Sequence, residues 1–227
     1  MIISHTYKFI YLRTEKTASS SLTDALTAVM ADADERPSMN RPKWAKYSPI
    51  HHGALKRQLP DLFGLHTHAT AAQARRVIGA KTFDSYLKFA VERNPWDRQV
   101  SLYHHRSHTT KRTPDFDRDM RSVWYRNTEY TRLNNWSIYA IGREVVADVV
   151  LRYETLDADI AALWSRLGLP GAPALGRARS YVPDRQHYAT YYSDTTRDLV
   201  GRWYSREIDA LGYRFEQPEN PTAAAVN

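Results

Sequence analysis

The sequence contains no cysteine, which excludes disulfide bonds and thiolate metal sites. Glycine is scarce as well: there are nine in 227 residues, and the first of them is Gly53. A GxxxxGKS/T nucleotide-binding loop near the start of the chain is therefore excluded. No apolar run approaches the ~20 residues of a membrane-spanning helix, and the first stretch, MIISHTYKFIYL, is too short and too interrupted for a signal peptide. We therefore expect a cytoplasmic protein without a membrane span.

The remaining composition is that of an ordinary globular protein with a basic charge. The 227 residues predict a single domain, which we place at 1–216, followed by a flexible tail at 217–227. The weakly patterned stretch 107–134 is interpreted as an insertion into this domain. The net charge of +7 favours anionic partners such as nucleotides, nucleic acids or acidic polymers.

Strands and helices are expected to alternate along the chain. Apolar and β-branched runs predict strands at 8–12, 62–68, 86–92 and 145–153, and helical periodicity predicts helices at 19–30, 70–78, 96–105, 157–167 and 194–211. This alternation predicts an α/β fold, a P-loop-like three-layer arrangement in which helices flank a central, mainly parallel sheet. Ligands of such sheets bind at the carboxyl ends of the strands.

The first candidate site is the turn between the strand at 8–12 and the helix at 19–30. The N–H groups at a helix start lack partners within the helix and, together with the helix dipole, they favour an anion. Lys16 adds a positive charge, and small residues follow it at Thr17, Ala18, Ser19, Ser20 and Ser21. These residues indicate a phosphate site, although serine and threonine also cap helices that bind nothing.

The second candidate site is the junction ERNPWDRQVS, which follows the strand at 86–92. Arg93 lies in the turn, and Ser101 lies in the next helix, where its side chain leans toward the helix start. A guanidinium fork beside a hydroxyl suits a terminal phosphate. In the alternative interpretation, Arg93 pairs with Asp97 to brace the turn and Arg98 is simply solvated.

Together the two motifs resemble those of the sulfotransferase superfamily, and in particular of the carbohydrate-type (family 2) sulfotransferases. KTASSS resembles the family's 5′-phosphosulfate loop KTAGTS, with Ser19 in the glycine position and Ser20 in the threonine position. FAVERNPWDRQVSLY resembles the 3′-phosphate motif FVRNPWDRLVSLY. HATAAQ at 68–73, VLRYETL at 150–156 and the stretch 191–215 also look like family blocks. The resemblance extends from Phe9 to Phe215 and is weakest at 32–62 and 107–134.

The resemblance implies an enzyme that moves a sulfuryl group from 3′-phosphoadenosine 5′-phosphosulfate (PAPS) to a hydroxyl of a carbohydrate or small-molecule acceptor. The product would be adenosine 3′,5′-bisphosphate (PAP), and no metal would be required. Residues 16–21 would hold the phosphosulfate, Arg93 and Ser101 would hold the 3′-phosphate, and Lys16 would stabilise the leaving group. The insertion at 107–134 would lie on the acceptor side.

A general base must take the proton of the acceptor hydroxyl. His66 and His68 flank Thr67 at the end of a predicted strand, where the two side chains would share one face. We predict that His68 is the base, because it matches the family's histidine before the next helix. Glu15 is the rival base and, with His66 and Arg185, a candidate acceptor contact.

Two further clusters are weaker candidates. The histidines His104, His105 and His108 lack an HExxH pattern, so a polar helix end is favoured over a metal site. The aromatic residues that could stack on an acceptor are Trp124, Tyr125, Tyr130 and Trp136, although core packing is favoured for them.

Two other functions stay open. A phosphotransferase with a glycine-free phosphate loop would bind ATP, and a basic nucleic-acid-binding protein would bind DNA or RNA. Because the positive charges are scattered and no nucleic-acid-binding motif is present, we expect no nucleic-acid partner.

Overall fold

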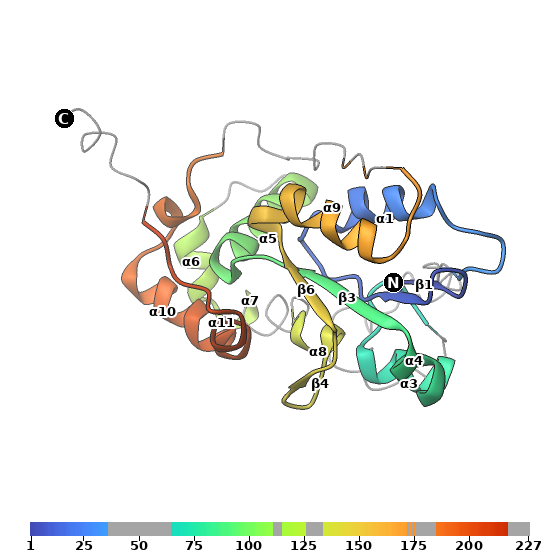
Figure 1. Cartoon of the computed structure of the whole chain (residues 1–227). Helices are drawn as coiled ribbons and strands as arrows, with labels where there is room; N and C mark the ends of the chain where they lie inside the picture. The colour runs from blue at the N-terminus through green and yellow to red at the C-terminus, as the bar shows by residue number, and fades with distance from the viewer. Residues whose placement is uncertain are drawn as a thin grey trace. The chain divides into compact units, whose positions relative to one another are not determined.

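The computed structural model describes residues 1–35, 65–110, 115–125, 134–171, 173, 175 and 185–217. Contacts divide the chain into two compact units. Figure 1 shows the chain coloured from blue at the N-terminus to red at the C-terminus. Unit 1 comprises Met1–Arg93 and Asn127–Arg179, and unit 2 comprises Asn94–Arg126 and Ser180–Asn227. The single domain at 1–216 and the insertion at 107–134 stay predictions. The predicted tail lies, except for Gln217, outside the described residues.

Unit 1 is built on a four-stranded sheet with the strand order β1-β2-β3-β6. The strands are β1 (Ile2–Ser4), β2 (Phe9–Tyr11), β3 (Leu87–Glu92) and β6 (Val149–Arg152). β1 pairs antiparallel with β2, whereas β2, β3 and β6 run parallel to one another. The mainly parallel sheet confirms the predicted fold class. The carboxyl edge of the sheet lies where β2, β3 and β6 end.

Helices cover both faces of this sheet, because alternate strand side chains enter two separate cores. Phe9 and Tyr11 pack with residues of α1 and α9, whereas Ile10 and Leu12 pack with residues of α3, α4 and α8. Figure 1 shows α1 and α9 on one side of the sheet and α3 and α4 on the other. The helices are α1 (Ser19–Thr27), α3 (Ala71–Ile78), α4 (Ala80–Ser85), α8 (Trp136–Tyr139) and α9 (Leu156–Arg166).

Two predicted strands differ from the structure. The described part of the strand at 62–68 is a turn, in which the Ala69 N–H donates to the His66 carbonyl over 3.0 Å. The strand at 145–153 is interrupted: β5 (Glu144–Val145) pairs with β4 (Ala140–Ile141), and β6 is a separate strand of the main sheet. Between β5 and β6, the Asp148 carboxylate accepts the Lys88 N–H at 2.7 Å and holds the turn against β3.

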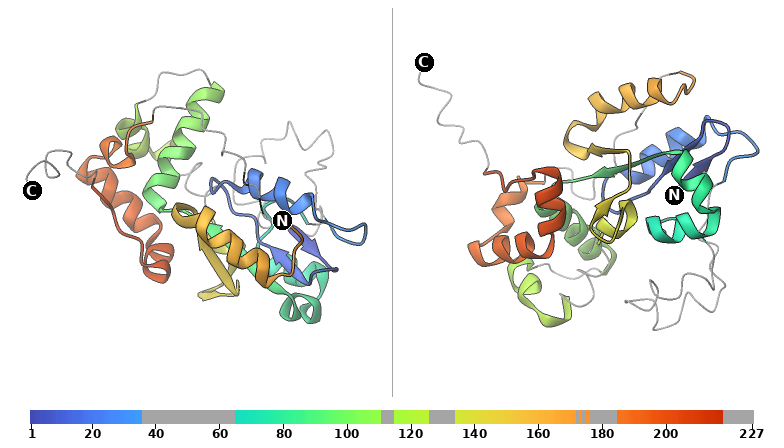
Figure 2. Two further views of the ribbon diagram at one scale, coloured as in Figure 1. Left: turned by 45° about the horizontal axis from the view of Figure 1, so that its top comes forward. Right: turned by 60° about the horizontal axis from the view of Figure 1, so that its bottom comes forward.

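Unit 2 is helical. Its helices are α5 (Pro95–Thr110), α6 (Phe116–Arg121), α7 (Val123–Tyr125), α10 (Asp194–Trp203) and α11 (Ser205–Leu211). The helix predicted at 194–211 is thus broken at Tyr204, whose hydroxyl donates to Gln99 of α5 over 3.0 Å. The green α5 and the red α10 pack together in Figure 2. Among the described residues of either unit, no helix is long and apolar enough to cross a membrane.

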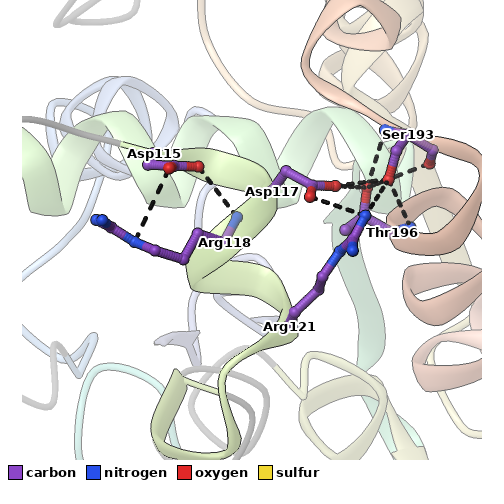
Figure 3. A network of polar contacts seen from close by, with 6 residues as sticks. All are labelled: Asp115, Asp117, Arg118, Arg121, Ser193 and Thr196. Atoms are coloured by element: carbon purple, nitrogen blue, oxygen red, sulfur yellow. Dashed lines mark hydrogen bonds and ion pairs between the residues drawn. The ribbon is translucent and has the colours of Figure 1, made fainter.

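A polar network attaches α6 to the start of α10 (Figure 3). Ser193 caps α10 by accepting the Thr196 N–H, and its own N–H donates to the Thr196 hydroxyl over 3.0 Å. Asp117 of α6 accepts the Ser193 hydroxyl proton and pairs with Arg121 at 2.9 Å. The Ser193 hydrogen bond, followed by the Arg121 charge, lowers the pKa of Asp117 despite some desolvation. A cap of this kind typically contributes about 1 kcal/mol.

Candidate functional site

Three loops meet at the carboxyl edge of the sheet in unit 1. The loops after β2 and β3 contribute Lys16 and Arg93, and the 3-10 turn that follows β6 contributes Tyr153. The Arg93 guanidinium lies over the Tyr153 ring, 4.0 Å from its centre, and its Nη1 donates to the Lys16 carbonyl over 3.4 Å. Arg93 is only 8% exposed, so its charge is held in place rather than freely solvated. The structure thus brings the Lys16 loop and Arg93 together, as the strand order requires.

The Lys16 loop has an unusual backbone. Lys16 and Ala18 have φ angles of 64° and 56°, in the left-handed region that glycine usually occupies. In general, left-handed residues that alternate with right-handed ones turn successive N–H groups toward one side, an arrangement that favours an anion. The loop leads directly into α1, whose N-cap is Ala18, and among the described residues no side chain caps the helix there. The first N–H groups of a helix have no partners within the helix and favour an anion.

Ser19 stands where the resembling family has glycine, yet its backbone does not need one. It is the first residue of α1, it is not among the positions with positive φ, and its carbonyl accepts the Thr23 hydroxyl at 2.6 Å. The side chain is 8% exposed and fits without a left-handed conformation. The strain that glycine would relieve lies instead at Lys16 and Ala18.

Replacing Ala18 with glycine is expected to raise the free energy of unfolding by roughly 0.5–1 kcal/mol. A left-handed conformation costs an L-residue about 1–2 kcal/mol, and the greater freedom of glycine in the unfolded chain offsets about 0.4–1 kcal/mol of the gain. Ala28→Gly is the matched control, because Ala28 has a right-handed φ of −66°, and there the substitution should destabilise. Urea denaturation of both variants measures the difference, and equal losses would contradict the loop conformation.

Two polar side chains, those of Thr14 and Asn135, hold the loop by hydrogen bonds. Thr14 is buried; its hydroxyl donates to the Val91 carbonyl and accepts from the Thr17 hydroxyl at 2.8 Å. Asn135 accepts the Glu15 N–H at 2.9 Å, donates to the Glu15 carbonyl over 3.1 Å, and donates to the Glu92 carboxylate over 3.3 Å. These contacts hold the backbone of the predicted cradle against β3.

His68 is placed beside the same loop. Its Nδ1 lies 2.9 Å from the Arg13 carbonyl; because a carbonyl only accepts, Nδ1 carries the proton and Nε2 is the basic nitrogen. The pKa of His68 is lowered to about 3, mainly by desolvation and further by the Arg13 charge, although the hydrogen bond to the Arg13 carbonyl acts in the opposite direction. The ring is therefore neutral at pH 7.

The predicted strand position of His66 is wrong. His66 does not share a strand face with His68, because the two residues lie in a turn in which the His68 N–H donates to His66 Nδ1 over 3.1 Å. This contact orients the turn that presents His68. The following helix is as predicted: Thr70 and Gln73 form a capping box at the start of α3, and Gly79 follows its end.

Comparison with known proteins decides the family. A profile of the sulfotransferase family matches residues 1–214 of this chain. The chain belongs to the sulfotransferase family. An uncharacterised protein of Archaeoglobus fulgidus is 35% identical over 98 residues, which cover 42% of this chain and 79% of that protein.

Two solved structures resemble this sulfotransferase at 14% sequence identity. Mouse sulfotransferase SULT7A1 complexed with PAP has a TM-score of 0.46, with 91% of this chain and 86% of that chain covered. A sulfotransferase from Alicyclobacillus acidocaldarius has a TM-score of 0.47, with 92% of this chain and 96% of that chain covered.

Several predicted residues of this sulfotransferase belong to unit 2. Ser101 is half-buried on α5, and Arg185 forms an ion pair with Asp97. The alternative interpretation of Arg98 as solvated is wrong: its side chain is fully buried, 3.7 Å from Glu207 and over the Tyr204 ring. The roles of Ser101 and Arg185 stay predictions.

The histidine and aromatic clusters have packing contacts. His104 packs edge-on against Tyr191, and its pKa is lowered by desolvation and then by the Arg185 charge. The described residues hold no group of three or more His, Cys, Asp or Glu side chains suited to a metal. Tyr125 and Trp136 are buried and bond to Gln99 and the Gly142 carbonyl, each at 2.9 Å. The side chains of His108 and Trp124, and all of Tyr130, lie outside the described part.

Three residues near the site were not predicted from the sequence: Arg13, Asn135 and Tyr153. Asn135 and Tyr153 are distant from both motifs in the chain. Asn135 lies outside the individual blocks that resemble those of the family, and Tyr153 lies in the block at 150–156, which by itself indicates no contact with Arg93. Arg13 could have been predicted from the sequence. It directly follows a predicted strand, three residues before Lys16, and the ends of parallel strands form the ligand-binding edge of a sheet.

Proposed function

We propose that this sulfotransferase moves a sulfuryl group from PAPS to a hydroxyl of a carbohydrate or small-molecule acceptor. Family membership supports sulfuryl transfer in general. The observation that carries the finer proposal is the placement of a neutral histidine, His68, beside a strained cationic loop that ends at a helix N-terminus.

The residues at the carboxyl edge fit this donor. The Lys16 loop and the first N–H groups of α1 would hold the phosphosulfate, because they combine a left-handed concave backbone with the positive end of a helix dipole. Arg93 would hold the 3′-phosphate with a preoriented guanidinium. Ser101 is assigned to the same phosphate by the family motif alone.

When bound, PAPS supplies a sulfuryl group attached to a phosphate leaving group. Lys16 stabilises the negative charge that develops on that phosphate, together with the loop N–H groups. His68 accepts the proton of the acceptor hydroxyl on Nε2 while Nδ1 keeps its bond to the Arg13 carbonyl. Its low pKa belongs to the chain without a bound anion; a neighbouring anion raises the pKa of an imidazole and makes it a stronger base.

Ligand titration tests the donor. Calorimetry should detect binding of PAP that is tighter than binding of ATP, because only PAP carries a 3′-phosphate for Arg93. Tighter binding of ATP would favour the phosphotransferase, and binding of DNA without either nucleotide would favour the nucleic-acid-binding protein. Incubation with PAPS and an acceptor library, followed by mass spectrometry, should then reveal products that have gained one sulfo group.

A further inference from the structure

Arg13 connects the proposed base to the proposed cradle. It follows Leu12 just beyond the end of β2, and its carbonyl accepts the Nδ1 proton of His68 at 2.9 Å. Its side chain extends to the other part of the site, where Nη2 donates to the Ser20 hydroxyl over 3.2 Å. Ser20 lies in the first turn of α1. One residue therefore lies beside both the imidazole and the helix N-terminus.

The Arg13 guanidinium lacks an anionic partner within the described part of the chain. Its one hydrogen-bond partner there is the neutral Ser20 hydroxyl, and Nε is buried without an acceptor. No ion pair joins Arg13 to a carboxylate of the described residues, although unit 1 contains several Asp and Glu side chains. A buried, unsatisfied guanidinium donor is costly, and an anion supplied by a ligand would remove that cost.

We propose that Arg13 contacts the sulfuryl oxygens of the donor, the group that PAPS carries and PAP lacks. This inference rests on the proposed function. The acceptor hydroxyl attacks the sulfur and loses its proton to His68, so the sulfuryl end of the donor must face His68. Arg13 is a cation on that side of the loop, and its carbonyl accepts the Nδ1 proton of the base itself. The two cations then stabilise different parts of the transition state. Lys16 stabilises the negative charge on the leaving phosphate, and Arg13 stabilises the sulfuryl group that is transferred.

The test compares two ligands that differ only in the sulfuryl group. The dissociation constants of PAPS and PAP are measured by calorimetry for the wild type, Arg13→Gln and Arg13→Lys. Loss of a hydrogen bond to a charged group should weaken PAPS binding to Arg13→Gln about tenfold or more, while PAP binding changes less than about twofold. Arg13→Lys should recover part of the loss, because it keeps the charge without the planar fork. Arg75→Gln, which removes an exposed arginine on α3, should bind both ligands like the wild type.

Each other outcome overturns the proposal in a recognisable way. Equal weakening of both ligands would assign Arg13 to the 5′-phosphate or to the folding of the loop. Unchanged binding of both, with a raised KM for an acidic acceptor, would assign it to the acceptor. If the wild type bound neither nucleotide, the proposed function itself would be wrong.

A second readout separates a charged role from a purely structural one. NMR titration of His68 should give a higher pKa in Arg13→Gln than in the wild type, because the substitution removes a positive charge that opposes protonation. In Arg13→Lys the pKa of His68 should stay close to the wild-type value. A His68 pKa that does not respond to Arg13→Gln would place the guanidinium away from the base and contradict the proposal.

Discussion

His68→Asn is expected to lower turnover at least ~100-fold and to leave PAP binding nearly unchanged. The asparagine amide takes the place of Nδ1 and can still donate to the Arg13 carbonyl, but nothing replaces the basic Nε2. A loss of this size corresponds to roughly 3 kcal/mol or more in barrier height. Turnover is measured with any acceptor found in the screen, and PAP affinity by calorimetry.

His187→Asn is the matched control for this variant. His187 caps a turn in unit 2 by accepting the Ala189 N–H on Nδ1, a role that asparagine can keep. Its turnover should equal that of the wild type. Near-normal turnover of His68→Asn would remove His68 from the mechanism and bring forward Glu15, the rival base.

The same histidine predicts a dependence of stability on pH. The pKa of His68 is about 3 in the folded chain, against an ordinary value of 6.5. Between these values the unfolded chain binds a proton that the folded chain excludes, so the free energy of unfolding should fall as the pH drops below about 6.5. His68→Asn should weaken this fall, since asparagine does not titrate. Urea denaturation from pH 7 to pH 4 compares the two proteins.

Arg93→Met is expected to weaken PAP binding about 100-fold. The guanidinium is preoriented over Tyr153, and loss of two charge-assisted hydrogen bonds to a phosphate costs about 3 kcal/mol or more. AMP, which lacks the 3′-phosphate, should bind the variant and the wild type alike. Arg166→Met is the control, because Arg166 is exposed at the end of α9 and should affect neither ligand.

The ligand pair makes the assignment of Arg93 falsifiable. Arg93 also donates to the Lys16 carbonyl, so it could serve the 5′ end of the nucleotide instead. Equal weakening of AMP and PAP in Arg93→Met would show that role and overturn the 3′-phosphate assignment. A fall in thermal stability without a change in PAP affinity would reduce Arg93 to a brace of the loop.

Elements with strong local signals were predictable. β2 and β3 are apolar runs that enter turns, and α3 begins at a capping box and ends at Gly79. The errors lie where tertiary contacts override the local pattern. The turn at His66 replaces a predicted strand because side-chain and backbone hydrogen bonds close it, and α10 ends before Tyr204 because that side chain bonds to Gln99.

The sequence by itself determined the family and predicted the chemistry of the candidate site. The order of residue types around Lys16 and Arg93 indicated two anion sites and, through the family resemblance, a sulfuryl donor. The family match supports sulfuryl transfer in general, and the two anion sites stay predictions. These features lie within short segments, where a strand, a turn and a helix start follow one another.

Only the tertiary structure decided the backbone conformation of the site, the contacts that position its residues and the protonation of His68. It showed that the left-handed backbone of the glycine-free loop lies at Lys16 and Ala18 and not at Ser19, and it placed Asn135 and Tyr153 beside residues far away in the chain. It also showed which nitrogen of His68 carries the proton, that the pKa of His68 is low, and that the Arg13 side chain lies beside Ser20. These properties depend on burial, hydrogen-bond partners and nearby charges, which exist only once the strands have paired. The absence of glycine near the start of the chain thus excluded a GxxxxGKS/T nucleotide-binding loop. The fold then showed that Lys16 and Ala18 adopt the left-handed conformation that glycine usually takes.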